Sequence, residues 1–94
     1  MLREKTHGQF ETTATISQTL KDAMRSSKNW RALPDGQAEA LEMIASKVAR
    51  ILSGDPAEAD HWVDIAGYAI LAKPDASEAE SAIVLDIAKA LKNG

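Results

Sequence analysis

Residues 37–71, QAEALEMIASKVARILSGDPAEADHWVDIAGYAIL, decide the fold. In the first half of this stretch, Leu41, Ile44 and Val48 recur at the spacing of one helix face. The second half repeats that spacing, and Trp62 lies on its apolar side, where we expect it in the core. Only a few residues join the two segments, and such a short connection makes two helices antiparallel neighbours. The sequence therefore predicts a central antiparallel helical hairpin over about residues 37–52 and 56–71.

Local signals mark where the two helices meet. Gly54 follows the last periodic residue, a position where a left-handed glycine commonly ends a helix. Asp55 is a candidate N-cap, with Pro56 in the first turn and Glu58 three residues after the cap. This arrangement predicts a capping box at the start of the second helix of the hairpin. Asp35 is the candidate N-cap of the first.

The flanking segments complete a small all-α fold. The predicted segments are an extended N-terminal arm (1–11), a first helix (about 13–27), a turn at Pro34-Asp35-Gly36 and a C-terminal helix (76–92). Asp75, followed by Glu78, predicts the cap of that last helix. We expect residues 1–94 to form a single helical domain, a small bundle of three to four helices around the central hairpin.

Composition narrows the class of protein. The chain has no cysteine, which excludes disulfides and cysteine-based zinc sites and fits a reducing compartment. No apolar run approaches the length of a membrane span, and no apolar segment typical of a secretory signal follows the N-terminus. Residues 32–94 carry five Lys or Arg and eleven Asp or Glu, which argues against a broad nucleic-acid surface there. We therefore expect a cytoplasmic protein that binds neither membranes nor nucleic acid directly.

Charged side chains concentrate along one edge of the predicted hairpin. Lys47 and Arg50 lie one turn apart on its first helix, and Asp60 and Asp64 lie one turn apart on its second, with Tyr68 a further turn on. In an antiparallel hairpin the basic pair can face the acidic pair. One interpretation is a salt-bridge network that fixes the register of the two helices. The other is a polar binding site at the seam.

The binding interpretation includes two more side chains. The hypothetical binding residues are Lys47, Arg50, Asp60, His61, Asp64, Tyr68 and Trp30. Trp30 is included because a tryptophan exposed at a helix end would anchor a partner. His61 could act as a base beside Asp64, but no nucleophile stands near it in the sequence. We assign no catalytic residue.

A magnesium site is an alternative use of the acidic residues. Glu39 and Glu42 share one helix face, and Asp60 and Asp64 share another, so the four could bind Mg²⁺ through oxygen ligands. The all-α nucleoside triphosphate pyrophosphatases use an E-x-x-E pair and an E-x-x-D pair in this way. The first pair matches here, but the second would need an acid where His61 stands. Mg²⁺ is the cofactor in this alternative, and the leading interpretation has none.

Two motifs carry a resemblance to a known family. The segments are KVARILSGD, starting at Lys47, and DHWVDIAGYA, starting at Asp60. They resemble a family of small phage and prophage proteins with a K-V-A-R-[IL] segment followed by D-x-W-x-D-I-A-G-Y-A, which we know only as a domain of unknown function. The resemblance covers about residues 7–72 and implies a phage-derived gene product that acts inside a bacterium. It brings no activity and no catalytic residues.

These observations lead to three functional hypotheses. The first is a phage-type accessory protein that binds a bacterial host protein or defence complex stoichiometrically, as anti-CRISPR and other counter-defence inhibitors do. The second is a Mg²⁺-dependent pyrophosphatase-like enzyme. The third is a structural homo-oligomer without a ligand. A short chain with a thin core gains stability from association, which makes self-association a realistic expectation.

Overall fold

The computed structural model describes residues 2–93, with side-chain surroundings for residues 9–86 and for Lys89. In chain order the elements are α1 (Leu2–Arg25), the short 3-10 helix η1 (Trp30–Ala32), α2 (Asp35–Ser53), α3 (Ala59–Ala72) and α4 (Glu78–Asn93). The described part of the chain contains these helices and no strand. The predicted all-α class is therefore confirmed.

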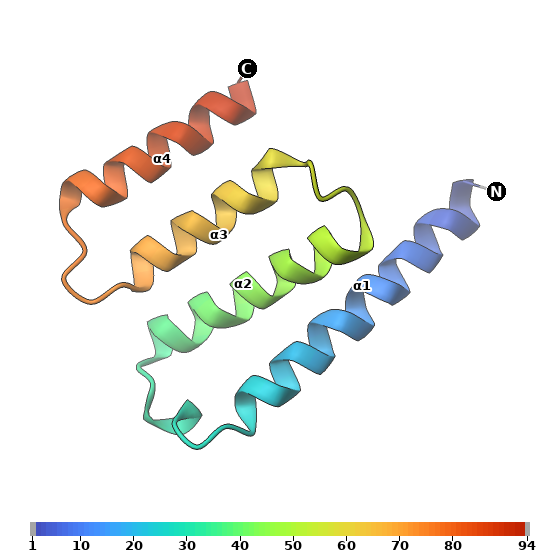
Figure 1. The fold of residues 1–94 in the computed structure, drawn as a ribbon, viewed down its shortest axis with the longest axis horizontal. Helices are drawn as coiled ribbons and strands as arrows, with labels where there is room; N and C mark the ends of the chain where they lie inside the picture. Colours follow the sequence, from blue (N-terminus) through green and yellow to red (C-terminus); the bar gives the residue numbers. More distant parts are fainter. Residues whose placement is uncertain (1, 94) are drawn as a thin grey trace.

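The four α-helices lie side by side in sequence order, each antiparallel to the next (Figure 1). Packing runs between successive helices and is most extensive between α2 and α3, which confirms the predicted central hairpin. The principal extents are 47 × 41 × 16 Å. Since an α-helix with its side chains is about 10–12 Å across, the small bundle is flattened into a layer one helix thick.

The predicted extended arm over residues 1–11 is wrong, because α1 is helical from Leu2 onward. The segment contains no proline, and its single glycine, Gly8, costs only about 1 kcal/mol relative to alanine in a helix. Once residues further along α1 are packed on α2, each added residue gains a hydrogen bond without a new nucleation cost. Phe10 does not anchor the segment to the protein, since it is exposed.

The residues at the helix caps differ from those that the sequence predicted. The helix after the hairpin turn begins at Ala59 with Glu58 in the cap position, so the capping box predicted at Asp55 is wrong. Asp55 instead accepts a hydrogen bond from the Ala57 N–H at 2.9 Å and closes the connecting turn. Gly54 has φ −127°, so it ends α2 without the left-handed conformation.

Two other caps are also displaced. α2 begins at Asp35 itself, with Pro34 in the cap position and no side-chain cap bond. α4 has a reciprocal capping box two residues later than predicted. The Glu80 N–H donates to Ser77 Oγ at 3.0 Å, and the Ser77 N–H donates to Glu80 Oε1 at 3.3 Å. Asp75 lies before this box with φ +62°, in the turn from α3.

The interior of the layer is small. Among the described residues, the buried apolar side chains are Ala40, Ala45, Ala49 and Ile51, all on α2. Trp62, predicted to be a core residue, is 54% exposed. Its indole N–H donates to the Pro56 carbonyl at 2.9 Å, which holds the ring against the α2–α3 turn. The core prediction failed because the neighbouring helices cover the two flanks of α3, and Trp62 points toward neither.

The flat arrangement gives the molecule two distinct faces. An ion pair between Arg25 and Glu42 puts α1 on one side of α2, and an ion pair between Lys47 and Asp64 puts α3 on the opposite side. With 3.6 residues per turn, the remaining positions of each helix then point to the front or the back of the layer. We name these two sides the apolar face, toward the reader in Figure 1, and the polar face behind it.

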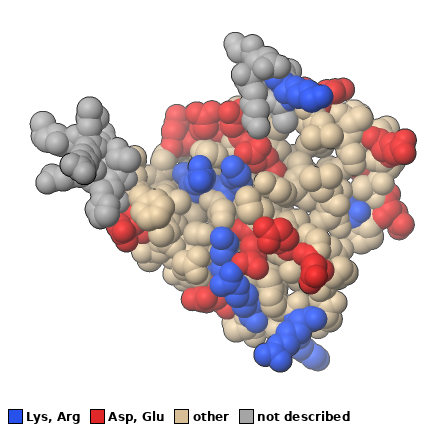
Figure 2. Space-filling view, turned by 180° about the vertical axis from the view of Figure 1, so that it is seen from behind, with Lys and Arg blue, Asp and Glu red and all other residues tan. Residues whose placement is uncertain are grey.

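Helix periodicity assigns the residues of each face. The apolar face carries Ile16, Leu20, Leu41, Leu52, Trp62, Ala66, Ala69 and Ile83. The polar face carries Gln18, Arg25, Lys47, Arg50, Asp60 and Asp64. Figure 2 shows the polar face, where Lys and Arg side chains lie among Asp and Glu side chains. The layer as a whole is amphipathic.

Candidate functional site

The polar face is hollowed between α3 and α4. The hollow is an open groove of about 380 Å³. Its lining residues are Lys47 from α2, Val63, Asp64, Gly67, Tyr68 and Leu71 from α3, and Val84 and Leu85 from α4. Three helices therefore contribute to one site, which we call the motif groove because Lys47, Asp64, Gly67 and Tyr68 belong to the two sequence motifs described above.

A single ion pair fixes the charged side of the motif groove. The ammonium of Lys47 lies 2.9 Å from Asp64 Oδ2, and the two side chains are 17% and 26% exposed. The pair joins α2 to α3 at mid-helix, so it sets the register of the hairpin. It also holds an ammonium and a carboxylate at the groove surface, where each retains capacity to hydrogen-bond a bound group. The structural and the binding interpretations of this seam therefore apply to the same two residues.

Gly67 determines how closely α4 approaches α3. A Cβ atom at this position would lie 3.3 Å from Val84 Cγ1, tighter than an ordinary van der Waals contact. The glycine thus permits a close helix crossing, as its place inside a helix suggests. The crossing is with α4, which carries Val84. The floor of the motif groove is set by this approach.

The other predicted binding residues do not line the motif groove. Asp60 lies one turn before Asp64 on the same side of α3 and is half-buried. Arg50 is exposed and forms no ion pair with the described part of the chain, so the predicted two-pair network reduces to one pair. Trp30 is half-buried on η1, in the connection between α1 and α2, and it does not line the groove.

His61 is half-buried on α3, one turn before Asp64. Its Nδ1 atom is buried, and no hydrogen-bond partner lies within reach among the described residues. A buried nitrogen without a partner lowers stability, because its interaction with water is lost without replacement.

The four carboxylates of the magnesium alternative do not gather at one place. Glu42 pairs with Arg25 on the α1 side of α2, whereas Asp64 pairs with Lys47 on the α3 side. Glu39 is exposed. Within the described residues, no three His, Asp or Glu side chains lie close enough together to bind one metal ion. This single chain therefore brings together no ligand set for Mg²⁺ in its described part.

Sequence reasoning missed the apolar rim of the motif groove. Leu71 and Leu85 are both exposed beside it. Leu71 could have been included, since it lies three residues after Tyr68 and seven after Asp64, on the same side of the helix. Leu85 carries no such signal, because its place depends on how α4 packs against α3.

Fold and site together define a small all-α protein, one helix thick, with a mixed polar and apolar groove on its charged face. Within residues 2–93, no helix combines the length and the apolar character needed to cross a bilayer. Residues 2–74 match the family model described as a domain of unknown function, DUF6378. Since the match spans most of the chain, the protein belongs to this family. No curated protein and no solved structure matches the chain.

Proposed function

We propose that this protein acts by stoichiometric binding to another protein, a segment of which occupies the motif groove. One observation carries the proposal. The residues of two separate sequence motifs, Lys47 in one and Asp64, Gly67 and Tyr68 in the other, line the same open groove. A structural salt bridge needs Lys47 and Asp64, but it does not account for a hollow bordered by Tyr68 and exposed Leu71.

The chemistry of the groove fits a protein segment. Leu71 and Leu85 offer apolar surface at the rim, while the Lys47–Asp64 pair and the Tyr68 hydroxyl offer hydrogen-bonding groups beside it. Protein interfaces combine these elements, with apolar and aromatic anchors at the centre and satisfied polar groups around them. An exposed leucine gains free energy when a partner covers it, at about 25 cal/mol per Å² of apolar surface.

The partner class that we propose is a bacterial host protein or defence complex. The resemblance of both motifs to small phage and prophage proteins supports this choice, and from it we also propose that binding occurs in the bacterial cytoplasm. Counter-defence inhibition, of which anti-CRISPR activity is one type, is the specific role that we propose from this resemblance. Small accessory proteins of this kind act by occupying a surface, which needs a groove and no catalytic group.

The experiment compares two charge substitutions on the polar face. Tagged wild-type protein is used to recover a bacterial partner, and its Kd is then measured with purified components. Leu71→Glu, at the groove rim, should raise the Kd at least about tenfold, as expected for an interface anchor. Gln18→Glu is the control, since it adds the same charge to the same face but on α1, away from the groove.

Two results would overturn the proposed function. One is binding that Leu71→Glu and Gln18→Glu affect equally, because the groove would then not be the site. The other is Mg²⁺-dependent hydrolysis of a nucleoside triphosphate that is lost in both Glu42→Gln and Asp64→Asn. That outcome would establish the pyrophosphatase-like alternative instead.

A further inference from the structure

The apolar face is left uncovered, which is unusual for a globular domain. Globular domains usually consist of two packed layers of secondary structure around a core, whereas this chain forms one layer 16 Å thick. The radius of gyration is 15.1 Å, compared with about 12.4 Å expected for a compact domain of this length. The second layer that would bury the apolar face does not come from the described part of the chain itself.

The accessible surface of the chain is larger than that of a compact monomer of the same mass. The accessible surface is 6896 Å², whereas a compact monomer of this mass exposes about 5,300 Å². The excess of about 1,600 Å², which is spread over both faces of the layer, exceeds the roughly 800 Å² that each partner buries in a standard interface. The layer therefore carries enough surplus surface for one standard interface.

Side chains on the apolar face have the composition of such an interface. Leu41, Leu52, Trp62 and Ile83 are all exposed and come from three different helices. Between them lie alanines, including Ala66 and Ala69, which permit close approach of another helix. At its edge, Lys73 and Glu80 neutralise each other in an ion pair of 2.7 Å. Large apolar side chains exposed together on one face are typical of an interaction site.

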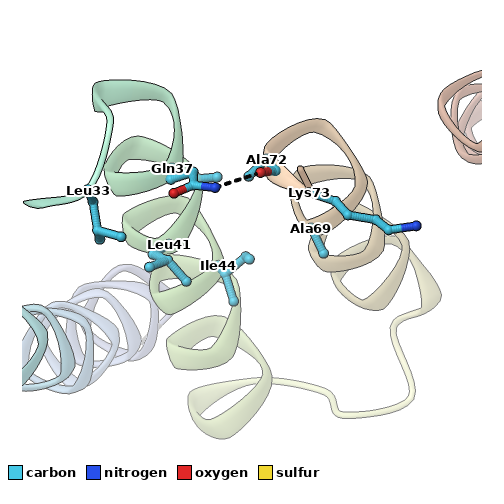
Figure 3. A pocket seen from close by; sticks show the side chains of 8 residues that line it. Leu33, Gln37, Leu41, Ile44, Ala69, Ala72 and Lys73 are labelled. Carbon is cyan, nitrogen blue, oxygen red and sulfur yellow. Dashed lines mark hydrogen bonds between the residues drawn. The ribbon is translucent and has the colours of Figure 1, made fainter. Parts of the chain in front are cut away.

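A groove crosses the apolar face between α2 and α3, with a volume of about 310 Å³. Figure 3 shows Leu33, Leu41 and Ile44 on one side of it and Ala69 on the other. The Gln37 side-chain N–H donates to the Ala72 carbonyl at 3.1 Å and bridges the two helices at its end. Large side chains of a docked layer can therefore enter between the helices.

We propose that the apolar face docks on the same face of a second copy of this chain. A second copy matches the surplus area, and it is present whenever the protein is synthesised. A partner that binds only transiently would leave Trp62 and the three aliphatic residues in water at all other times. Although the chain has a net charge of −3, its apolar stripe contributes no charge repulsion between copies.

The resulting dimer would have two-fold symmetry, with each copy contributing the same residues. It would be a two-layer helical sandwich, the architecture that the single chain lacks. Both polar faces would point outward, so each motif groove would remain open. The dimer interface would lie on the opposite face of the layer from the motif groove, and its formation does not depend on the proposed function of that groove.

The test uses two leucines as a matched pair. Leu52 on the apolar face is 65% exposed, and Leu71 on the polar face is 66% exposed, so glutamate replaces an equally accessible leucine in each case. Light scattering should give wild type and Leu71→Glu twice the chain mass of 10.1 kDa. Leu52→Glu should raise the dimer dissociation constant at least about tenfold. Circular dichroism checks that both variants keep their helix content.

A second measurement leaves the apolar face intact. In Trp30→Phe, Trp62 is the remaining tryptophan, and burial in a dimer should protect it from quenching by acrylamide at concentrations where the mass is doubled. Quenching should increase on dilution as the mass falls. A wild-type mass of one chain at every concentration would overturn the proposal. So would equal effects of Leu52→Glu and Leu71→Glu on the mass, or a Trp62 that is quenched freely in the dimer.

Discussion

At the scale of single residues, Lys47 and Asp64 combine structural and functional roles. Their ion pair is mostly removed from water, and it joins α2 to α3 while it forms one side of the motif groove. A pair of this kind contributes little compared with a well-packed apolar pair, but loss of one partner leaves the other charge without compensation. The contribution of the pair to stability can therefore be separated from its contribution to binding by comparing variants that lack one charge with a variant that lacks both.

We expect Lys47→Met to lower the free energy of unfolding by about 1–2 kcal/mol, because Asp64 is left partly buried and unpaired. The double variant Lys47→Met/Asp64→Leu should recover most of that loss. Urea denaturation of both single variants and the double variant measures the coupling. Arg50→Met is the control, since Arg50 is exposed and one turn away, and its effect should stay within about 0.5 kcal/mol. Additive effects of the two single substitutions would contradict a structural role for the pair.

At the scale of elements, the carboxylate of Glu80 stabilises the first turn of α4. Glu80 accepts hydrogen bonds from the Lys73 ammonium at 2.7 Å and from the Ser77 N–H at 3.3 Å. The hydrogen bond from Lys73, followed by that from the Ser77 N–H, lowers the pKa of Glu80 below its ordinary value of 4.5. The two bonds link the end of α3 to the first turn of α4, so they act on the docking of the whole helix.

This linkage predicts how stability depends on pH. Because the pKa of Glu80 is lowered in the folded protein, its contribution is present above pH 4.5 and is lost as pH falls through the lowered pKa. On acidification through this range, the Tm of wild type should therefore fall further than the Tm of Glu80→Gln. Thermal melts followed by circular dichroism measure the difference. Glu78→Gln is the control, because Glu78 lies in the same turn but forms no such bond with the described residues, so the Tm of this variant should fall with pH as that of wild type does.

At the scale of the whole molecule, the single layer makes the inner helices more stable than the outer ones. α2 packs between α1 and α3, and α3 packs between α2 and α4, whereas the outer helices have one packed neighbour each. All the buried apolar residues of the described chain lie on α2. Docking of a second copy would cover one face of every helix, so it would not remove the difference between inner and outer helices.

We expect native-state hydrogen exchange to follow this order. Amides of α2 and α3 should exchange at least about tenfold more slowly than those of α4, since an outer helix can open without disturbing the hairpin. Exchange followed by NMR or mass spectrometry measures the protection along the chain. Equal protection in α4 and α2 would show that the four helices open as one unit, contrary to this expectation.

The sequence by itself determined the local structure. The apolar spacing of residues 37–71 and their short connection predicted the central hairpin, because periodicity and loop length are local properties. The same spacing predicted that Lys47 and Arg50 can face Asp60 and Asp64, and the structure shows one pair of these, Lys47 with Asp64. Helix ends were predicted less well, since the cap residues at Asp55 and Asp75 compete with turn conformations that depend on the neighbouring helices.

Only the tertiary structure decided which helix faces are covered. Periodicity shows that Trp62 shares a face with other apolar residues, and this pattern predicts burial in any closed bundle. In an open layer, however, each helix is covered on its flanks, and the same apolar face remains exposed. The motif groove depends in the same way on α4, whose approach to Gly67 brings Leu85 beside Leu71. The physical reason is that burial depends on where neighbouring elements lie, and spacing along one helix does not specify this.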